Sequence, residues 1–152
     1  MTVPIYLINL CTSPYRLTTS QQRLAEQNID FIRVEAVSGK ALTAQQIARH
    51  YSEEINTQKY HSGLTKGQIG CYFSHRKTWQ LIADGEYEFA VILEDDFELS
   101  GDLSEAIETV SKLDFQWDLI KLAAYQSRQR KIAFQQAINS NFNIVIHQKP
   151  MS

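Results

Sequence analysis

The sequence has 152 residues, of which 43% are hydrophobic and 21% charged, and its 15 basic and 17 acidic residues leave a formal net charge of -2. This composition is typical of a globular chain and argues against disorder, and without a basic excess nothing favours a nucleic-acid partner. No apolar run reaches the roughly 18 residues that a membrane span needs. At this length we expect a single domain that covers residues 1–152.

The two cysteines, Cys11 and Cys71, form no Cys-x-x-Cys unit, which argues against a zinc-ribbon or redox motif. Two free thiols in a reducing compartment are the expected state. The N-terminus lacks the basic region and the small-residue cleavage site of a signal peptide. We therefore expect a cytoplasmic protein.

The N-terminal segment predicts a strand, a helix and a second strand. The run at 5–8 is β-branched and aromatic, and Ser13 before Pro14 is a typical helix start, with a capping side chain before proline at the first helical position. The helix is expected to reach about Gln27, and the run at 31–37 predicts the second strand. In a compact α/β domain this order implies a right-handed parallel crossover.

Two capping-box patterns predict further helix starts, each a threonine followed three residues later by a glutamine: Thr43 with Gln46, and Thr65 with Gln68. The first helix is expected to end near residue 50, and the polar stretch at 51–64 is predicted to be a loop because it has no clear period. The second helix is expected over 66–83, where apolar side chains recur at roughly helical spacing and Gly85 follows.

The most hydrophobic run of the chain lies at 89–93 and shows no alternation, which is typical of a central strand covered on both faces. Glu94, Asp95 and Asp96 follow it directly. Beyond them we expect a helix capped by Asp102, a strand at 119–122, and a hairpin formed by 131–134 and 142–147.

The three consecutive carboxylates at a strand end are the strongest functional signal. Ligands of open α/β sheets bind outside the carboxyl ends of the strands, and three adjacent anions need a cation or hydrogen-bond donors to offset their repulsion. Mg²⁺ and Mn²⁺ prefer carboxylate oxygens and often share them with substrate phosphates. The acids therefore indicate either a metal–diphosphate site or a solvated acidic turn that ends the strand.

Several short motifs, in a fixed order over nearly the whole chain, carry a resemblance to a known family. They are Tyr6-Leu7-Ile8-Asn9-Leu10 with Ser13-Pro14-x-Arg16; Glu35-Ala36-Val37-x-Gly39; Gly67-x-Ile69-Gly70-Cys71-x-x-Ser74-His75-x-x-x-Trp79; Val91-Ile92-Leu93-Glu94-Asp95-Asp96; and Trp117-Asp118-Leu119-Ile120-Lys121-Leu122. With them the chain resembles the bacterial lipooligosaccharide glycosyltransferases of glycosyltransferase family 25, which also includes collagen galactosyltransferase domains.

The resemblance implies an α/β, GT-A-like fold with a Rossmann-like, mostly parallel sheet. It also implies the transfer of galactose or glucose from a UDP-sugar to a lipooligosaccharide acceptor, with inversion and with Mn²⁺ or Mg²⁺ at the diphosphate. Carried over onto the acidic triplet, it makes Asp96 the metal ligand and gives Asp95 a contact with the ribose or the sugar hydroxyls. Glu94 would support the loop and belongs with the donor-binding residues.

Five more positions are candidates for donor binding, each with a structural alternative. Arg16 follows the first strand and is either a nucleotide contact or a surface helix arginine. Glu35 and Ala36 end the second strand and either touch the nucleoside or form an ordinary strand end. Ser74 and His75 lie in the longest motif, where His75 either bonds the donor phosphate or sugar or is a structural helix histidine. Gly67 and Gly70 suggest close backbone approach, and both tryptophans are expected in the core.

The family continues beyond the point where this sequence stops, so we expect a C-terminally truncated fold whose acceptor side is missing. An inverting transfer needs a base close to the acceptor hydroxyl, and we assign no residue of this chain to that role. The alternative function is a nucleotide-sugar-binding remnant with little or no transferase activity, paired as a homodimer through an exposed sheet edge. Either form is expected at most to touch the inner face of the bacterial inner membrane.

Overall fold

The computed structural model describes residues 3–60, 62–122 and 131–148. The chain divides into two compact units, residues 1–100 and residues 101–152, which are described separately. The expectation of one domain over the whole chain stays a prediction.

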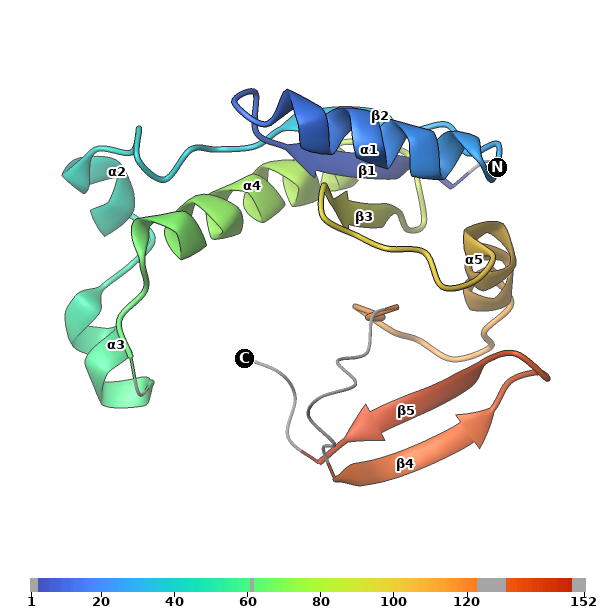
Figure 1. Cartoon of the computed structure of the whole chain (residues 1–152). Coiled ribbons are helices and arrows are strands. Elements are labelled where there is room, and N and C mark those ends of the chain that lie inside the picture. The colour runs from blue at the N-terminus through green and yellow to red at the C-terminus, as the bar shows by residue number, and fades with distance from the viewer. Residues whose placement is uncertain (1–2, 61, 123–130, 149–152) are drawn as a thin grey trace. The chain divides into compact units, whose positions relative to one another are not determined.

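The first unit contains a three-stranded parallel sheet in the order β2-β1-β3 (Figure 1). Its strands are β1 (Ile5–Asn9), β2 (Ile32–Glu35) and β3 (Val91–Glu94). In the register, Ile8 of β1 lies opposite Val34 of β2 and Glu94 of β3. This confirms the predicted α/β class and parallel sheet, and it is compatible with a Rossmann-like fold.

The central strand differs from the predicted one. All five residues of β1 are buried, whereas β3 is only half-buried and pairs, among the described residues, with β1 alone. The expectation that the run at 89–93 forms a central strand covered on both faces was therefore wrong. Its first two residues precede β3, so the apolar run is part connection and part strand.

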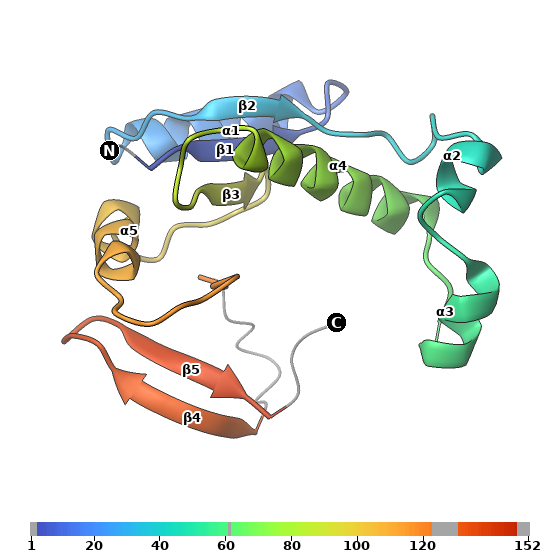
Figure 2. The ribbon, with the colours of Figure 1, turned by 180° about the vertical axis from the view of Figure 1, so that it is seen from behind.

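Helices α1 (Pro14–Ala25) and α4 (Lys66–Ala83) cover opposite faces of the sheet (Figures 1 and 2). Pro14 stands at the first position of α1 as predicted, but Ser13 makes no side-chain capping bond. Instead the Ser13 carbonyl accepts a hydrogen bond from Asn9 Nδ2 at 3.1 Å. The start of α1 is thereby tied to the end of β1.

The buried face of α4 agrees only in part with the predicted apolar pattern, because Ile69 is buried and Ile82 packs against the core while small residues form the rest of the face. Its buried residues are Ile69, Gly70, Ser74 and Thr78, while Trp79, which we expected in the core, is 45% exposed. The reason is a close approach of backbones: a Cβ atom on Gly70 would lie 2.6 Å from the nitrogen of Gly39. Small side chains at four-residue spacing let the segment after β2 lie directly on this helix.

Both predicted capping boxes are present, at the starts of α2 (Ala44–Ala48) and α4. The loop predicted at 51–64 was wrong in its middle, because residues Glu53–Lys59 form helix α3. The Ser52 side chain accepts a hydrogen bond from the Ile55 amide and so caps this helix. None of the α3 residues is buried, which explains why its sequence carries no amphipathic period.

The second unit contains α5 (Leu103–Ser111) and an antiparallel hairpin of β4 (Ile132–Ala137) and β5 (Asn143–His147). Asp102 caps α5 as predicted, and the hairpin confirms the predicted one with a longer first strand. Residues 119–122 form no strand, so that expectation was wrong.

No helix within the three described ranges combines the length and the apolar character that crossing a membrane requires.

Candidate functional site

The carboxyl edge of the sheet brings together the ends of all three strands of the first unit. Asn9 ends β1, Glu35 ends β2, and Glu94 ends β3 directly before Asp95 and Asp96. In the strand order β2-β1-β3, Asn9 stands between the other two ends. This is the edge at which open parallel sheets bind their ligands.

Asn9 holds this edge together from the inside. It is 1% exposed, and its Nδ2 donates to Asp95 Oδ2 at 2.7 Å. Its Oδ1 accepts from Arg33 Nε at 3.2 Å and from Arg33 Nη2 at 3.0 Å. Because the amide oxygen accepts from a guanidinium and the amide nitrogen donates to a carboxylate, the side chain is fixed in one orientation. Asn9 was not among the predicted site residues, although a polar residue at the end of a fully buried strand is a usable signal.

Arg16 lies in the first turn of α1 and joins two of the three acids. Its Nη1 lies 3.1 Å from Asp95 Oδ1, and its Nη2 lies 2.5 Å from Asp96 Oδ2. The guanidinium is thus the cation that offsets the repulsion of neighbouring carboxylates. Asp95 is buried, and its backbone is held as well, because Ser20 Oγ donates to its carbonyl at 3.0 Å.

The third acid, Glu94, faces α4 and forms a separate cluster with two residues of that helix. His75 Nε2 lies 3.3 Å from Glu94 Oε1, and the Cys71 thiol donates to Glu94 Oε2 at 3.9 Å. Partial burial raises the pKa of the exposed Cys71 thiol above its ordinary value, and the charges of Glu94 and Asp96 and the bond to Glu94 raise it further. Cys71 and His75 are four residues apart, so they share one face of the helix. Cys71 was not among the predicted site residues.

The other candidates contribute backbone contacts. Ser74 is buried, and its Oγ accepts from the Val37 amide and donates to the Gly70 carbonyl, both at 2.8 Å. The Ala36 amide donates to the Asn9 carbonyl at 2.9 Å. Glu35 is exposed, and its carbonyl accepts from Lys77 Nζ at 3.0 Å. Ser74 therefore positions the segment after β2 on α4.

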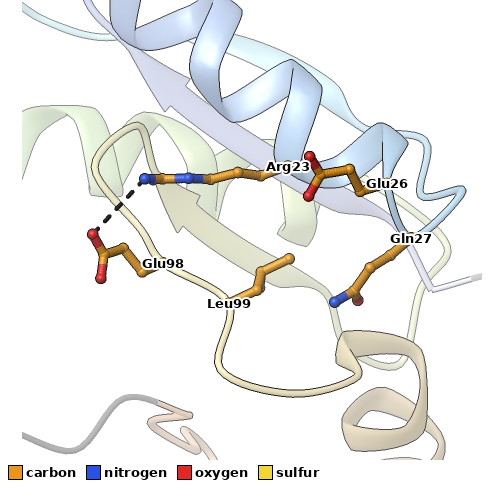
Figure 3. Close-up of a pocket in the computed structure, with 5 residues that line it drawn as sticks. All are labelled: Arg23, Glu26, Gln27, Glu98 and Leu99. Atoms are coloured by element: carbon orange, nitrogen blue, oxygen red, sulfur yellow. Dashed lines mark ion pairs between the residues drawn. The ribbon is translucent and has the colours of Figure 1, made fainter.

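A polar hollow of about 320 Å³ lies elsewhere, at the C-terminal end of α1 (Figure 3). Its lining residues are Arg23, Glu26, Gln27, Glu98 and Leu99. An ion pair of 3.8 Å joins Arg23 Nη2 to Glu98 Oε1 across it. None of the predicted donor-binding residues lines the hollow. Since Arg16 and Arg23 are separated by about 10 Å along the helix, the hollow and the carboxyl edge are different places.

The residues at the carboxyl edge fit a hard divalent cation by their chemistry. Asp95 and Asp96 offer carboxylate oxygens, the ligands that Mg²⁺ and Mn²⁺ prefer. The side chain of Asp96 is 67% exposed, and its ion pair with Arg16 uses Oδ2, which leaves Oδ1 outside that pair. Such a cation would compete with Arg16 for the carboxylates of Asp95 and Asp96.

A comparison with known families matches residues 2–151 to the model of glycosyltransferase family 25, described as an LPS biosynthesis protein. This agrees with the resemblance drawn from the sequence motifs.

Curated relatives include animal proteins. Procollagen galactosyltransferase 2 of Mus musculus is 34% identical over 123 residues, which cover 76% of this chain and 20% of that protein. Procollagen galactosyltransferase 1-B of Xenopus laevis is 33% identical over 127 residues, 78% of this chain and 20% of the relative. Inactive glycosyltransferase 25 family member 3 of Mus musculus is 30% identical over 130 residues, 80% of this chain and 22% of the relative. The chain thus spans about a fifth of the length of these relatives.

Proposed function

The chain belongs to glycosyltransferase family 25, and from this premise we propose that it is a hexosyltransferase with a GT-A-like fold. The donor is a UDP-sugar that carries galactose or glucose, the reaction inverts the anomeric centre, and a divalent cation is required. The acceptor is a lipooligosaccharide or a related glycan, and the reaction takes place in the cytoplasm at the inner face of the bacterial inner membrane.

One observation carries this proposal: Arg16 is joined to both Asp95 and Asp96. The contact unites the segment after the first strand with the acids after the third, at the carboxyl edge of a parallel sheet. In nucleotide-binding α/β domains this edge holds the phosphates and the ribose. A guanidinium next to two carboxylates offers the donor both a phosphate-binding fork and acceptors for hydroxyl groups.

We assign each donor-binding residue a role that its surroundings support. Arg16 binds the diphosphate, and Asp95, held in place by Asn9, accepts from the ribose or sugar hydroxyls. Asp96 is the metal ligand; when bound, Mn²⁺ or Mg²⁺ neutralises the charge that develops on the diphosphate leaving group. The remaining residues line the nucleoside and sugar side or hold it in place: Glu35, Ala36, Ser74, His75 and Glu94.

A second function, binding of a nucleotide-sugar without transfer, is also supported by an observation. Arg16 already supplies a positive charge between the two aspartates, so the diphosphate could be bound there without transfer to an acceptor. A homodimer that pairs through the sheet edge belongs to this second candidate.

The test is the binding of UDP-galactose and UDP-glucose, measured by calorimetry with Mn²⁺ and with a chelator. Asp96→Ala should abolish the Mn²⁺-dependent part of the binding, and Asp96→Asn should weaken it severely, because an amide keeps one oxygen but loses the charge that a hard cation needs. Glu98→Ala is the matched control: Glu98 is an exposed acid of the same loop, paired with Arg23, and its removal should leave binding unchanged.

Release of the sugar distinguishes the two candidate functions. A transferase should show Mn²⁺-dependent donor hydrolysis or transfer, and Asp96→Ala should remove it. Binding without any turnover would favour the second candidate. Donor binding that is equally tight in wild type and Asp96→Ala, with and without Mn²⁺, would overturn the metal-dependent site.

A further inference from the structure

Three side chains of different chemistry converge between α4 and the end of β3. The Cys71 thiol, the His75 imidazole and the Glu94 carboxylate each offer one ligand atom, and these atoms all lie within 4.8 Å of one another. His75 Nε2 lies 3.3 Å from Glu94 Oε1, and Cys71 Sγ lies 3.9 Å from the other oxygen of the same carboxylate, Oε2. Among the residues that the structure describes, no other set of three or more histidine, cysteine, aspartate or glutamate side chains brings its ligand atoms this close together.

These separations are close to those of a metal site. Zinc bonds of about 2.0–2.3 Å in a tetrahedron place neighbouring ligand atoms roughly 3.3–3.8 Å apart. The distance from His75 Nε2 to Glu94 Oε1 lies in that range, while the three ligand atoms as a set lie within 4.8 Å of one another. Side-chain movements of up to about 1 Å would therefore bring the set to tetrahedral separations.

The elements that carry the ligands are held in place by other parts of the protein. Cys71 and His75 lie one turn apart on α4, and the neighbouring stripe of this helix, with Gly70 and Ser74, packs against the segment after β2. Glu94 is the last residue of β3, which is paired with β1 in the sheet. The ligands thus come from a helix and a strand that already have fixed positions, which lowers the entropic cost of forming the site.

The charge around the cluster also suits a cation. Glu94 is itself an acid, and Asp96 lies near enough to Cys71 for its charge to act on the thiol. A thiolate, an imidazole and a carboxylate form a mixed set that Zn²⁺ and Co²⁺ favour, whereas Mg²⁺ and Mn²⁺ prefer oxygen ligands throughout.

We propose that Cys71, His75 and Glu94 form a binding site for a borderline-soft divalent ion of the Zn²⁺ type, with water in the fourth position. This site is separate from the hard-cation ligand Asp96 and does not depend on the proposed function. Because His75 and Glu94 are also assigned to the donor site, the metal-bound and metal-free chains should differ in donor affinity, and that consequence alone rests on the proposed function.

Titration of the full chain with Co²⁺ under reducing, oxygen-free conditions tests the site without any sugar donor. We expect a thiolate-to-cobalt charge-transfer band in the near ultraviolet, visible bands of four-coordinate intensity, and displacement of both by Zn²⁺ at one equivalent. Cys71→Ser should abolish the charge-transfer band. His75→Ala and Glu94→Gln should each weaken Co²⁺ binding by at least about tenfold, since losing a residue that only hydrogen-bonds a metal ligand already costs about 10–100-fold.

Two control variants locate the signal. Cys11→Ser removes the other free, exposed thiol of the chain and should leave the band in place. Asp96→Asn should damage Mn²⁺-dependent donor binding but retain the charge-transfer band. Failure of one metal site is therefore distinguishable from failure of the other. Circular dichroism and thermal melting verify that each variant is folded.

The proposal is overturned if the wild-type chain shows no charge-transfer band with excess Co²⁺. It is equally overturned if the band persists in folded Cys71→Ser, disappears in Cys11→Ser, or keeps its affinity in both His75→Ala and Glu94→Gln.

Discussion

Asn9 and Asp96 lie at the same edge of one sheet, yet Asn9 is 1% exposed and the Asp96 side chain is 67% exposed. The contrast divides the site into inner residues, which are buried and bonded to other parts of the protein, and outer residues, which reach solvent. The inner residues are Asn9, Gly70, Ser74 and Asp95, and the outer ones are Cys71, His75, Glu94 and Asp96.

The difference assigns two tasks to neighbouring positions. The hydrogen bonds and the packing of the inner residues hold the neighbouring segments in place, so replacing an inner residue should lower the stability of the fold. Outer residues hold charge and ligand atoms at the surface, so their replacement should change binding and reactivity and leave the fold nearly intact.

Asn9→Ala should cause the largest loss of stability. The change removes a donor from buried Asp95 and from the partly buried Ser13 carbonyl, and a buried polar group that loses its partner costs about 1–3 kcal/mol, so we expect a loss of about 2–4 kcal/mol in all. Urea unfolding measures it. A loss below about 1 kcal/mol would show that Asn9 does not hold the edge together.

Two glycines of α4 should respond in opposite directions to the same substitution. In Gly70→Ala the new methyl group would meet backbone atoms at 2.6 and 2.7 Å, which should lower stability by about 1–3 kcal/mol, as overpacking does. Gly67→Ala is the matched control, because its Cβ would have Thr65 Oγ1 at 3.8 Å as its neighbour. It should stabilise the helix by up to about 1 kcal/mol. Equal effects in thermal melts would contradict the close approach.

Among the outer residues, Glu94→Gln should change the reactivity of Cys71. Because burial, Glu94 and Asp96 raise the pKa of Cys71, less thiolate is present at a given pH, and alkylation is slow. Glu94→Gln removes one of the charges, so the pKa should fall and iodoacetamide should react faster at pH 8. The rates are compared in the Cys11→Ser background, where Cys71 is the thiol that reacts.

That rate measurement also fixes the pH dependence. Lowering the pKa moves the rise of the alkylation rate to lower pH, so the wild-type and Glu94→Gln rates should converge at a pH above both pKa values. A Glu94→Gln rate equal to or below the wild-type rate at pH 8, in a folded variant, would mean that Glu94 does not control the thiol.

The smallest effect is expected at the polar hollow. The Arg23–Glu98 ion pair spans 3.8 Å, and the Glu98 side chain is 86% exposed, so Glu98→Gln should change stability by less than about 0.5 kcal/mol. Chemical denaturation of Glu98→Gln and of Asn9→Ala under the same conditions compares the two losses of stability. A loss as large as that of Asn9→Ala would remove the distinction between inner and outer positions.

Sequence patterns predicted those elements whose signal is local. The apolar runs marked all three strands of the parallel sheet, and the Thr–Gln pairs marked the starts of α2 and α4 because both partners lie within one turn. Helix α3 was missed since it buries nothing, and an unburied helix leaves no hydrophobic period. The strand expected at 119–122 failed because four apolar or long side chains in a row are compatible with several backbone states.

The candidate site was likewise predicted only where its signal is local in the sequence. The acids could be placed at a strand end from their own neighbours in the sequence, and the motif order pointed to Arg16. Asn9 and Cys71 were missed because their partners lie 86 and 23 residues away. The buried face of α4 was predicted at Ile69 but not at Gly70, Ser74 and Thr78, because these small side chains fit a nearby backbone and hydrophobicity does not report that fit.

The spacing along α4 has a consequence for insertions and deletions. Gly70, Ser74 and Thr78 form one stripe of this helix, and Cys71 and His75 form the stripe beside it, displaced by one residue or about 100° of rotation. One residue added between Gly70 and Ser74 would turn the two halves of the helix by that angle relative to each other. The glycine and the serine could then no longer face the same segment after β2, and the imidazole would leave the carboxylate. Insertions and deletions in α4 should therefore be tolerated only after Thr78, where the two stripes have ended.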